Sequence, residues 1–357
     1  MRTTRLIREV GLLGLGASIA FMLRAGFGGD AGQSDRDRAH AAEKPGSSGH
    51  GEDADSPAAM PAPGWFDVLK RTFHEVGRDR VLAVAAGVTF YGLLAVFPAI
   101  GALVSLYGLF ASPSSIGEHL GMLQGVLPEG AFELVRERVE KLAGAETQTL
   151  GLSLLVSLGL SIWSANAGMK AVFDALNVAY GEEEKRGFFT LNLASLAFTF
   201  GTLVFVLLAI GAIVAVPVIL DMLHLGEAAE TVMSLGRWPV MVLVLMTGLA
   251  LLYRFGPSRD RAQWRWVSPG ALVAAALWIV GSGLFSWYVA NFENYDETYG
   301  AVGGAIGLMM WMWLSATIVL LGAEFNSEAE RQTHKDTTEG PPQPMGLRGA
   351  DAADRKA

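Results

Sequence analysis

Residues Thr298–Ala323 read TYGAVGGAIGLMMWMWLSATIVLLGA and contain no charged side chain. An α-helix rises about 1.5 Å per residue and the hydrocarbon core of a bilayer is about 30 Å thick, so about 20 apolar residues span it. This stretch exceeds that length. We therefore expect it to cross a membrane as a helix.

Other parts of the chain show the same pattern. The charge-free runs are Val81–Gly117, Thr147–Met169, Gly187–Leu220, Trp238–Tyr253 and Trp266–Phe292. Trp238–Tyr253 is short, but Arg237 and Arg254 can reach opposite interfaces and extend it. None of the runs alternates polar and apolar residues as barrel strands do. The sequence predicts an all-α membrane protein, a six-helix transmembrane bundle with spans at about 83–109, 148–169, 190–218, 237–254, 267–290 and 300–323.

Composition supports this class. Apolar residues make up 51% of the chain and charged residues 17%, against about 25% charged in soluble domains. The net charge is −8 without a dense Lys/Arg stretch, so no nucleic-acid partner is expected. The chain has no cysteine, which excludes disulfides, thiolate nucleophiles and Cys-ligated metals.

Short loops on the cytoplasmic side of a membrane are rich in Lys and Arg. One set of flanks holds most of these residues: Lys70, Arg71, Arg78, Arg80, Lys170, Lys185, Arg186, Arg254, Arg259, Arg261, Arg265, Arg331 and Lys335. The opposite set holds only Arg136, Arg138, Lys141 and Arg237. Both termini are therefore expected in the cytoplasm, with the spans in the bacterial inner membrane.

The two ends of the chain differ from the middle. Residues 1–64 form an extension in which the short apolar segment Val10–Leu23 follows Arg2, Arg5 and Arg8. This resembles a signal peptide, but cleavage would conflict with the orientation, as would a seventh span. We favour an interfacial anchor or a start site placed too early. Gly28–Gly64 has the composition of a disordered linker, residues 65–335 form the transmembrane domain, and 336–357 are expected to be a disordered cytoplasmic tail.

Two segments outside the spans have amphipathic helical spacing. The first carries Trp65, Phe66, Leu69, Phe73 and Val76 on one face and predicts a helix on the cytoplasmic leaflet. The second, with Phe132, Val135, Val139 and Leu142, predicts a helix at the outer face. Pro98, Pro217 and Pro239 lie toward the outer ends of their spans, where each removes a backbone donor. These prolines either serve packing or open a cavity.

Several motifs in order resemble one family. They are AAGVTFYGLLAVFP at Ala85–Pro98, IWSANAGMKAVFDALNVAY at Ile162–Tyr180, YRFGP at Tyr253–Pro257, WVSPGA at Trp266–Ala271 and YGAVGGAIGLMMWMWLSATIVLLGAEFN at Tyr299–Asn326. From about Trp65 to Lys335 the chain resembles the YihY/BrkB family of bacterial inner-membrane proteins, once labelled ribonuclease BN. Ala95 departs from the serine that the family usually has there.

The resemblance implies a set of motif or path residues: Tyr91, Pro98, Trp163, Asn166, Tyr299, Gly300, Gly304, Glu324 and Asn326. The four-residue spacing of Gly300 and Gly304 suits close helix packing or a dimer seam, and less readily a translocation path. Glu324 is expected to be an interface residue, unless it lies near Arg254 or Lys170.

The spans contain no ionisable group near mid-membrane, which disfavours a common proton or sodium relay. The chain also lacks an HExxH cluster, a Walker loop and a GxSxG turn. We expect no enzyme, metal or cofactor. The first hypothesis is transport or gating of a lipid-like or small amphipathic solute, with membrane lipids and a second copy as further candidate partners. The alternative is a scaffold for envelope assembly, and a membrane-embedded hydrolase ranks last.

Overall fold

The computed structural model describes residues 49–108, 136, 150–223, 227–291 and 301–356. The regular elements among these residues are all helices, and no strand is present among them. The long helices are α4 (Val81–Gly108), α7 (Leu150–Tyr180), α8 (Phe188–Leu223), α9 (Glu227–Phe255), α10 (Trp264–Asn291) and α12 (Ala301–Arg331). A helix therefore covers the described part of each stretch in which a span is predicted. The short elements are η1 (Pro57–Ala59), α3 (Ala62–Arg78) and α13 (Asp351–Asp354).

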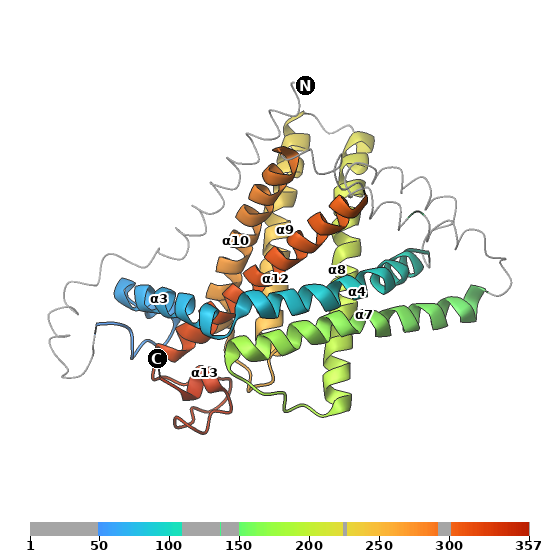
Figure 1. Ribbon diagram of the computed structural model, residues 1–357. Helices are drawn as coiled ribbons and strands as arrows, with labels where there is room; N and C mark the ends of the chain where they lie inside the picture. The colour runs from blue at the N-terminus through green and yellow to red at the C-terminus, as the bar shows by residue number, and fades with distance from the viewer. Residues whose placement is uncertain (1–48, 109–135, 137–149, 224–226, 292–300, 357) are drawn as a thin grey trace.

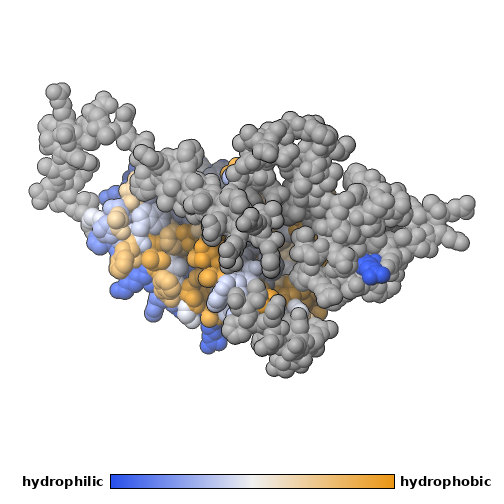
Figure 2. All heavy atoms as spheres, turned by 90° about the horizontal axis from the view of Figure 1, so that it is seen from above, coloured by the Kyte–Doolittle hydropathy of each residue, from blue (hydrophilic) through white to orange (hydrophobic). Residues whose placement is uncertain are grey.

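Among the described residues, three helical segments are long and apolar enough to cross a membrane: Phe188–Ala209, Trp264–Val289 and Gly304–Arg331. The bent pair α3 and α4 would make a fourth if counted as one span. In their most apolar windows only 22%, 11% and 17% of the residues are buried inside the protein, and Figure 2 shows apolar side chains gathered on the surface. Such exposure is unfavourable in water. The chain is an all-helical, multi-pass membrane protein.

The long helices other than α8 diverge from one end of the molecule, and α8 crosses α4 and α7 (Figure 1). From that end α4 and α7 run together in one direction, while α9 and α10 run in another. α12 lies between them and contacts both α10 and α4. Across this last contact, Trp313 Nε1 donates a hydrogen bond to the Leu82 carbonyl at 2.9 Å.

The break between α3 and α4 turns the chain by 63°. Arg80 adopts a left-handed conformation there, with φ 51°, which is uncommon for a residue with a side chain. α3 buries Gly64, Val68 and Thr72 and leaves Phe66 and Phe73 exposed. The predicted amphipathic helix is thus present.

The end of α7 lies beyond the predicted boundary at residue 169. The helix continues to Tyr180 because Phe173, Leu176 and Tyr180, at helical spacing, form a fully buried stripe. Gly181 then ends it with φ 67°, a conformation that glycine adopts without strain.

The expectation of a disordered tail at 336–357 is corrected by the structure. Thr338 forms an antiparallel bridge with Ala262, and the Arg348 side chain is buried. Arg348 donates hydrogen bonds to the carbonyls of His334 and Ala353, each at 2.8 Å. The polar, Pro/Gly-rich tail is held by these bonds rather than by a periodic apolar face.

The predicted linker is corrected in the same way for its last part. His334 N donates to the Glu52 carbonyl at 2.7 Å, and Ala54 and Met60 are buried against Trp266. The predictions for Val10–Leu23, for Phe132–Leu142, and for Tyr299 and Gly300 fall outside the described residues.

Candidate functional site

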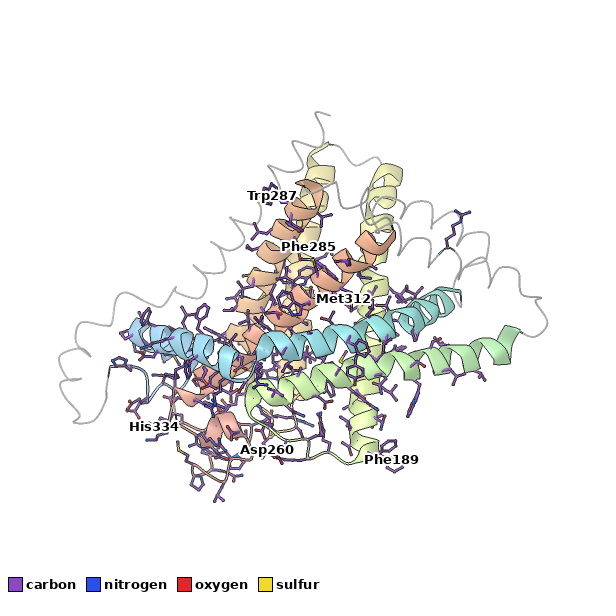
Figure 3. All side chains as sticks on the ribbon, viewed as in Figure 1. Phe189, Asp260, Phe285, Trp287, Met312 and His334 are labelled. Carbon is purple, nitrogen blue, oxygen red and sulfur yellow. The ribbon has the colours of Figure 1, made fainter. Side chains whose placement is uncertain are left out.

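The helix ends that lie together form a region that we call the polar cap. It comprises the end of α12 from residue 324, the loops 181–187 and 256–263, helix α3, and residues 332–356 with α13. Figure 3 shows Asp260 and His334 in this region, whereas Phe285 and Trp287 lie toward the far end of α10. Three of the family-like motifs, YRFGP, WVSPGA and GAEFN, contribute to it.

Beside the polar cap, a close helix approach joins α10 to α12. Gly270 faces Gly322 so closely that a Cβ on Gly270 would overlap the Gly322 carbonyl oxygen. Asn326 completes the contact, since its Oδ1 accepts from Gly270 N at 2.7 Å and its Nδ2 donates to the Val267 carbonyl at 3.1 Å. Nearby, Tyr253 Oη donates to the Val319 carbonyl at 2.8 Å. These motif residues therefore join α9, α10 and α12.

A fully buried ion pair lies at the centre of the polar cap. Arg259 Nη2 and Glu330 Oε1 are 2.6 Å apart, and both side chains have 0% exposure. Glu330 Oε2 also accepts a 2.7 Å hydrogen bond from Thr337, and the Arg259 guanidinium lies 4.4 Å from the Tyr180 ring centroid. The pair thus joins the α9–α10 loop, α12, α7 and the tail.

The end of α7 and the α7–α8 loop are both joined to the α9–α10 loop. Asn177 Oδ1 accepts from Ser258 N at 2.7 Å, and Arg186 donates to the Gly256 carbonyl at 2.8 Å. Burial raises the pKa of the Glu184 carboxyl, but hydrogen bonds from Arg186 outweigh this and bring that pKa down to about 2. Glu184 is therefore ionised in this loop at neutral pH.

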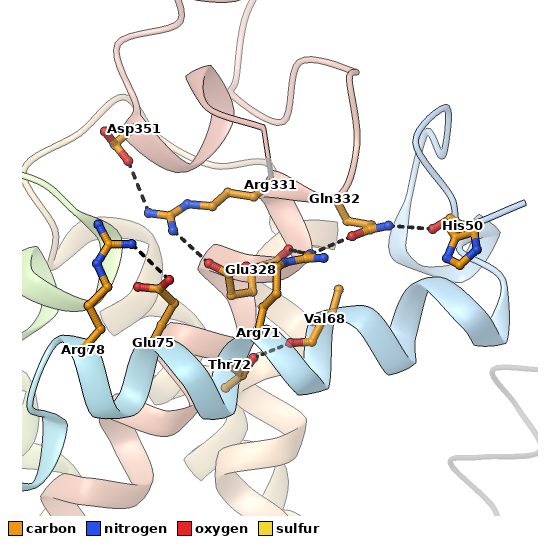
Figure 4. A network of polar contacts seen from close by, with 10 residues as sticks. All are labelled: His50, Val68, Arg71, Thr72, Glu75, Arg78, Glu328, Arg331, Gln332 and Asp351. Atoms are coloured by element: carbon orange, nitrogen blue, oxygen red, sulfur yellow. Dashed lines mark hydrogen bonds and ion pairs between the residues drawn. The ribbon is translucent and has the colours of Figure 1, made fainter. Parts of the chain in front are cut away.

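Helix α3 is held against α12 by a polar network drawn in Figure 4. Arg71 Nε lies 2.7 Å from Glu328 Oε2, and Arg71 Nη2 donates to Gln332 Oε1 at 2.6 Å. Trp65 adds a stacked contact with Phe325, with ring centroids 5.5 Å apart. The neighbouring Lys70 is exposed.

We expect Arg71→Ala to loosen α3, because it removes two charge-assisted contacts and leaves Glu328, which is only 2% exposed, without that partner. Hydrogen bonds to charged groups contribute about 1.5–3 kcal/mol each in net terms. Limited proteolysis in nanodiscs should therefore cut near α3 faster in this variant. Lys70→Ala is the matched control and should leave the rate unchanged; equal rates for the two variants would contradict the assigned contacts.

Glu324, which the sequence indicates as an interface residue, is only 1% exposed. Its charged neighbours include Asp79, Glu328 and Arg331. Its Oε1 has no hydrogen-bond partner. The structure thus brings Glu324 together with Asn326 in the polar cap.

The remaining predicted residues lie apart from the polar cap. Asn166 is buried and its Oδ1 accepts from Thr199 at 3.2 Å, joining α7 to α8. Tyr91 and Trp163 are about half exposed, and Pro98 lies within the continuous helix α4. A Cβ on Gly304 would meet nothing within 4 Å, so no described helix uses that glycine for close packing.

Ala95, the departure from the family pattern, packs between helices. A Cβ on Gly168 of α7 would lie 3.1 Å from the Ala95 Cβ of α4. This position therefore belongs to a helix contact among the described residues.

Sequence reasoning missed Arg259, Glu330 and Arg71 as members of one site. In the sequence, Arg71 and Arg259 served only as positive charges that indicate the cytoplasmic side of the membrane. A usable signal was the spacing of Glu324, Glu328 and Arg331, which places charged side chains on one face of the helix that continues from an apolar span. Among the described residues, no group of three or more His, Asp or Glu side chains could hold a metal ion.

Comparison with known proteins gives the chain's relatives. A ribonuclease-like protein, YfkH, of Bacillus subtilis is 32% identical over 265 residues, covering 72% of this chain and 94% of its own length. A UPF0761 membrane protein of Alkalilimnicola ehrlichii is 29% identical and covers 70% of this chain and 55% of its own length. For the UPF0761 membrane protein PBPRA3489 of Photobacterium profundum the values are 26%, 75% and 82%.

No solved structure matches the chain. The model of the family described as virulence factor BrkB matches residues 72–345, a range that contains all five motifs and most of the polar cap. The chain therefore belongs to the BrkB family of membrane proteins, as its motifs indicate.

Proposed function

We propose that the six long helices each cross a bacterial inner membrane once, with both termini in the cytoplasm. Support comes from the helix ends gathered in the polar cap: the start of α4, the end of α7, the start of α8, the end of α9, the start of α10 and the end of α12. Along the chain, each helix that begins at the cap is thus followed by a helix that ends there, or the reverse. Its abundance of arginine fits the cytoplasmic face.

Within this topology, we propose that the protein moves or gates a lipid-like or small amphipathic solute. The observation that carries the proposal is that helices joined at one end diverge toward the other: α4 and α7 run together in one direction, and α9 and α10 run in another (Figure 1). We call α4 and α7 the first group, and α9, α10 and α12 the second group. The polar cap would close the cytoplasmic end between the two groups.

The nature of the solute is inferred from the surfaces of the spans. Few of their residues are buried, so a bound molecule would share its surroundings with lipid tails. Buried polar groups such as Asn166 and Thr199 offer hydrogen bonds to a polar head. An amphipathic molecule suits both surroundings.

We propose that the protein is not a nuclease, although one relative carries a ribonuclease-like name. The described residues supply no metal-binding cluster, and the whole chain carries a net charge of −8. A polyanionic substrate would be repelled by that charge.

The transport proposal is tested by reconstitution. Purified protein in liposomes should move a fluorescent phospholipid analogue between leaflets faster than protein-free liposomes do. A panel of phospholipid analogues and small amphipaths that move no faster than in empty vesicles would contradict the proposal.

The alternative, a scaffold role, is favoured by a specific observation. A Cβ on Gly304 or on Gly307 would meet nothing within 4 Å, which leaves a surface for another helix. Native mass spectrometry in nanodiscs discriminates the two roles. A retained lipid-like molecule supports transport, whereas a partner protein in fixed ratio with only bulk lipid supports the scaffold.

A further inference from the structure

A group of arginine and aromatic side chains lies where α9 ends and α10 begins. The Arg254 guanidinium is 4.4 Å from the ring centroid of Trp264 and 5.4 Å from that of Phe255. The Arg261 guanidinium is 5.3 Å from the same Phe255 ring, and the two rings meet edge to face with their centroids 6.2 Å apart. We call these four residues the arginine cluster. It holds two positive charges against one aromatic ring, a contact that is favourable for each of them.

A carboxylate neutralises only one of these charges. Glu339 Oε2, from the tail, lies 2.7 Å from Arg254 Nη2. The Arg254 side chain is 4% exposed, and its Nε has no hydrogen-bond partner among the described residues. Arg261 is exposed and forms no ion pair within the part of the chain that the structure describes, since the neighbouring Asp260 carboxylate lies against Gly349 instead. The arginine cluster thus carries one positive charge in excess.

The arginine cluster borders the apolar surface of the helices. Trp264 is 50% exposed. Leu251 precedes Phe255 by four residues on α9, and Leu272 follows Trp264 by eight residues on α10, so each leucine shares a helix face with a ring of the cluster. Both leucines are exposed. In the proposed topology, on which this inference rests, the cluster lies at the cytoplasmic boundary of the membrane, a level at which Trp is enriched.

We propose that the arginine cluster binds the phosphodiester head of an anionic phospholipid in the cytoplasmic leaflet. Arg261 contacts the phosphate, because its exposed guanidinium can donate two parallel hydrogen bonds to phosphate oxygens. Arg254 adds to the attraction through its charge, and Trp264 with the two leucines contacts the apolar part of the lipid. The charges balance, since a phosphodiester brings one negative charge to a site that has one positive charge in excess. A zwitterionic lipid brings an ammonium group as well and should bind less tightly.

Glu339 competes with the lipid for the same positive charge. Its carboxylate accepts a hydrogen bond from Arg254 and is itself 58% exposed, so a bound phosphate and Glu339 repel each other across the arginine cluster. Removal of the negative charge of Glu339 should therefore strengthen lipid binding, whereas removal of the positive charge of Arg261 should weaken it. Opposite effects separate a headgroup site from a structural role, because damage to the fold would weaken binding in both variants.

Native mass spectrometry of the full chain in detergent, titrated with phosphatidylglycerol or with zwitterionic phosphatidylcholine, measures these affinities. We expect the natural sequence to bind phosphatidylglycerol more tightly than phosphatidylcholine. Arg261→Gln should weaken phosphatidylglycerol binding about fivefold or more, and Glu339→Gln should strengthen it by about the same factor. Equal affinity for the two lipids would overturn the proposal.

Arg265→Gln is the matched control for Arg261→Gln. Arg265 is an exposed arginine four residues away, and its Nε donates a 2.7 Å hydrogen bond to Gln263 outside the arginine cluster. Its replacement should leave the affinity for phosphatidylglycerol unchanged. Equal losses in Arg261→Gln and Arg265→Gln would show a diffuse attraction to positive charge and would overturn the site.

Photocrosslinking locates the lipid in a bilayer. Phosphatidylglycerol with a photoreactive acyl chain, illuminated with the full chain in nanodiscs, should label the peptides that contain Leu251 and Leu272, and Arg261→Gln should reduce this labelling. Labelling that is the same with and without the substitution would contradict the arginine cluster as the binding site. Because neither readout measures orientation or flux, failure of this inference is distinguishable from failure of the proposed topology or of transport.

Discussion

Replacing Gly270 by alanine is expected to prevent α10 and α12 from packing. The added Cβ would overlap the Gly322 carbonyl oxygen and would lie 2.5 Å from Asn326 Cγ. Overpacking costs about 1–3 kcal/mol where side chains can yield, and more where the obstacle is backbone. Separation of the helices would also break both hydrogen bonds of the Asn326 amide. The variant should fail to accumulate as a monodisperse protein in detergent.

The same helix provides the control for this prediction. Gly283 also lies in α10, and a Cβ there would meet nothing within 4 Å. Gly283→Ala should be neutral or stabilising by up to about 1 kcal/mol, since alanine favours the helix over glycine. Size-exclusion chromatography and thermal unfolding of both variants measure the difference. A folded Gly270→Ala protein with unchanged thermal stability would contradict the close approach.

Replacing Glu330 by alanine should have the second large effect. Arg259 would retain a fully buried charge without its ion-pair partner, and breaking a buried pair in this way costs about 3–5 kcal/mol. Thr337 would lose its acceptor as well. We expect a large fall in the thermal unfolding temperature in nanodiscs, together with faster proteolysis of the tail.

A double-mutant cycle separates the ion pair from simple loss of packing. Arg259→Met combined with Glu330→Met removes both charges and should cost less than either substitution alone, because neither charge is left uncompensated. Arg355→Ala is a suitable surface control, since Arg355 is 73% exposed in its pair with Asp351 and such pairs contribute about 0–1 kcal/mol. Additive losses in the cycle would contradict strong coupling of the two charges.

The long helices could be predicted from the sequence because lipid imposes a simple rule. A charge-free run in a bilayer must pair its own backbone groups, and a helix achieves this within one segment. The boundaries were less predictable. The charge at Lys170 suggested an end for α7, yet Phe173, Leu176 and Tyr180 continue its buried face.

The polar cap could not be predicted in the same way, because its contacts join residues far apart in the sequence. Arg71 meets Glu328, and Arg348 meets backbone carbonyls that carry no side-chain signature. Glu324 was singled out as an interface residue, but its nearly complete burial depends on the tertiary packing of α12 and has no signature in the sequence. Asn326 was identified through family resemblance, and its role in the helix contact emerged only from the structure.

The central claim is that opening of the polar cap controls movement of an amphipathic solute. The Asn177 side chain at the end of α7 accepts a hydrogen bond from Ser258 N in the α9–α10 loop, so cysteines at these two positions are suited to a crosslink that joins the first group to the second. The decisive measurement is phospholipid-analogue flux in liposomes containing Asn177→Cys/Ser258→Cys protein, before crosslinking, after it and after its reversal by reductant. Our account predicts flux that falls to the level of empty vesicles on crosslinking and returns on reduction. Equal flux in the crosslinked and reduced states, or flux no faster than in empty vesicles in both, would contradict it.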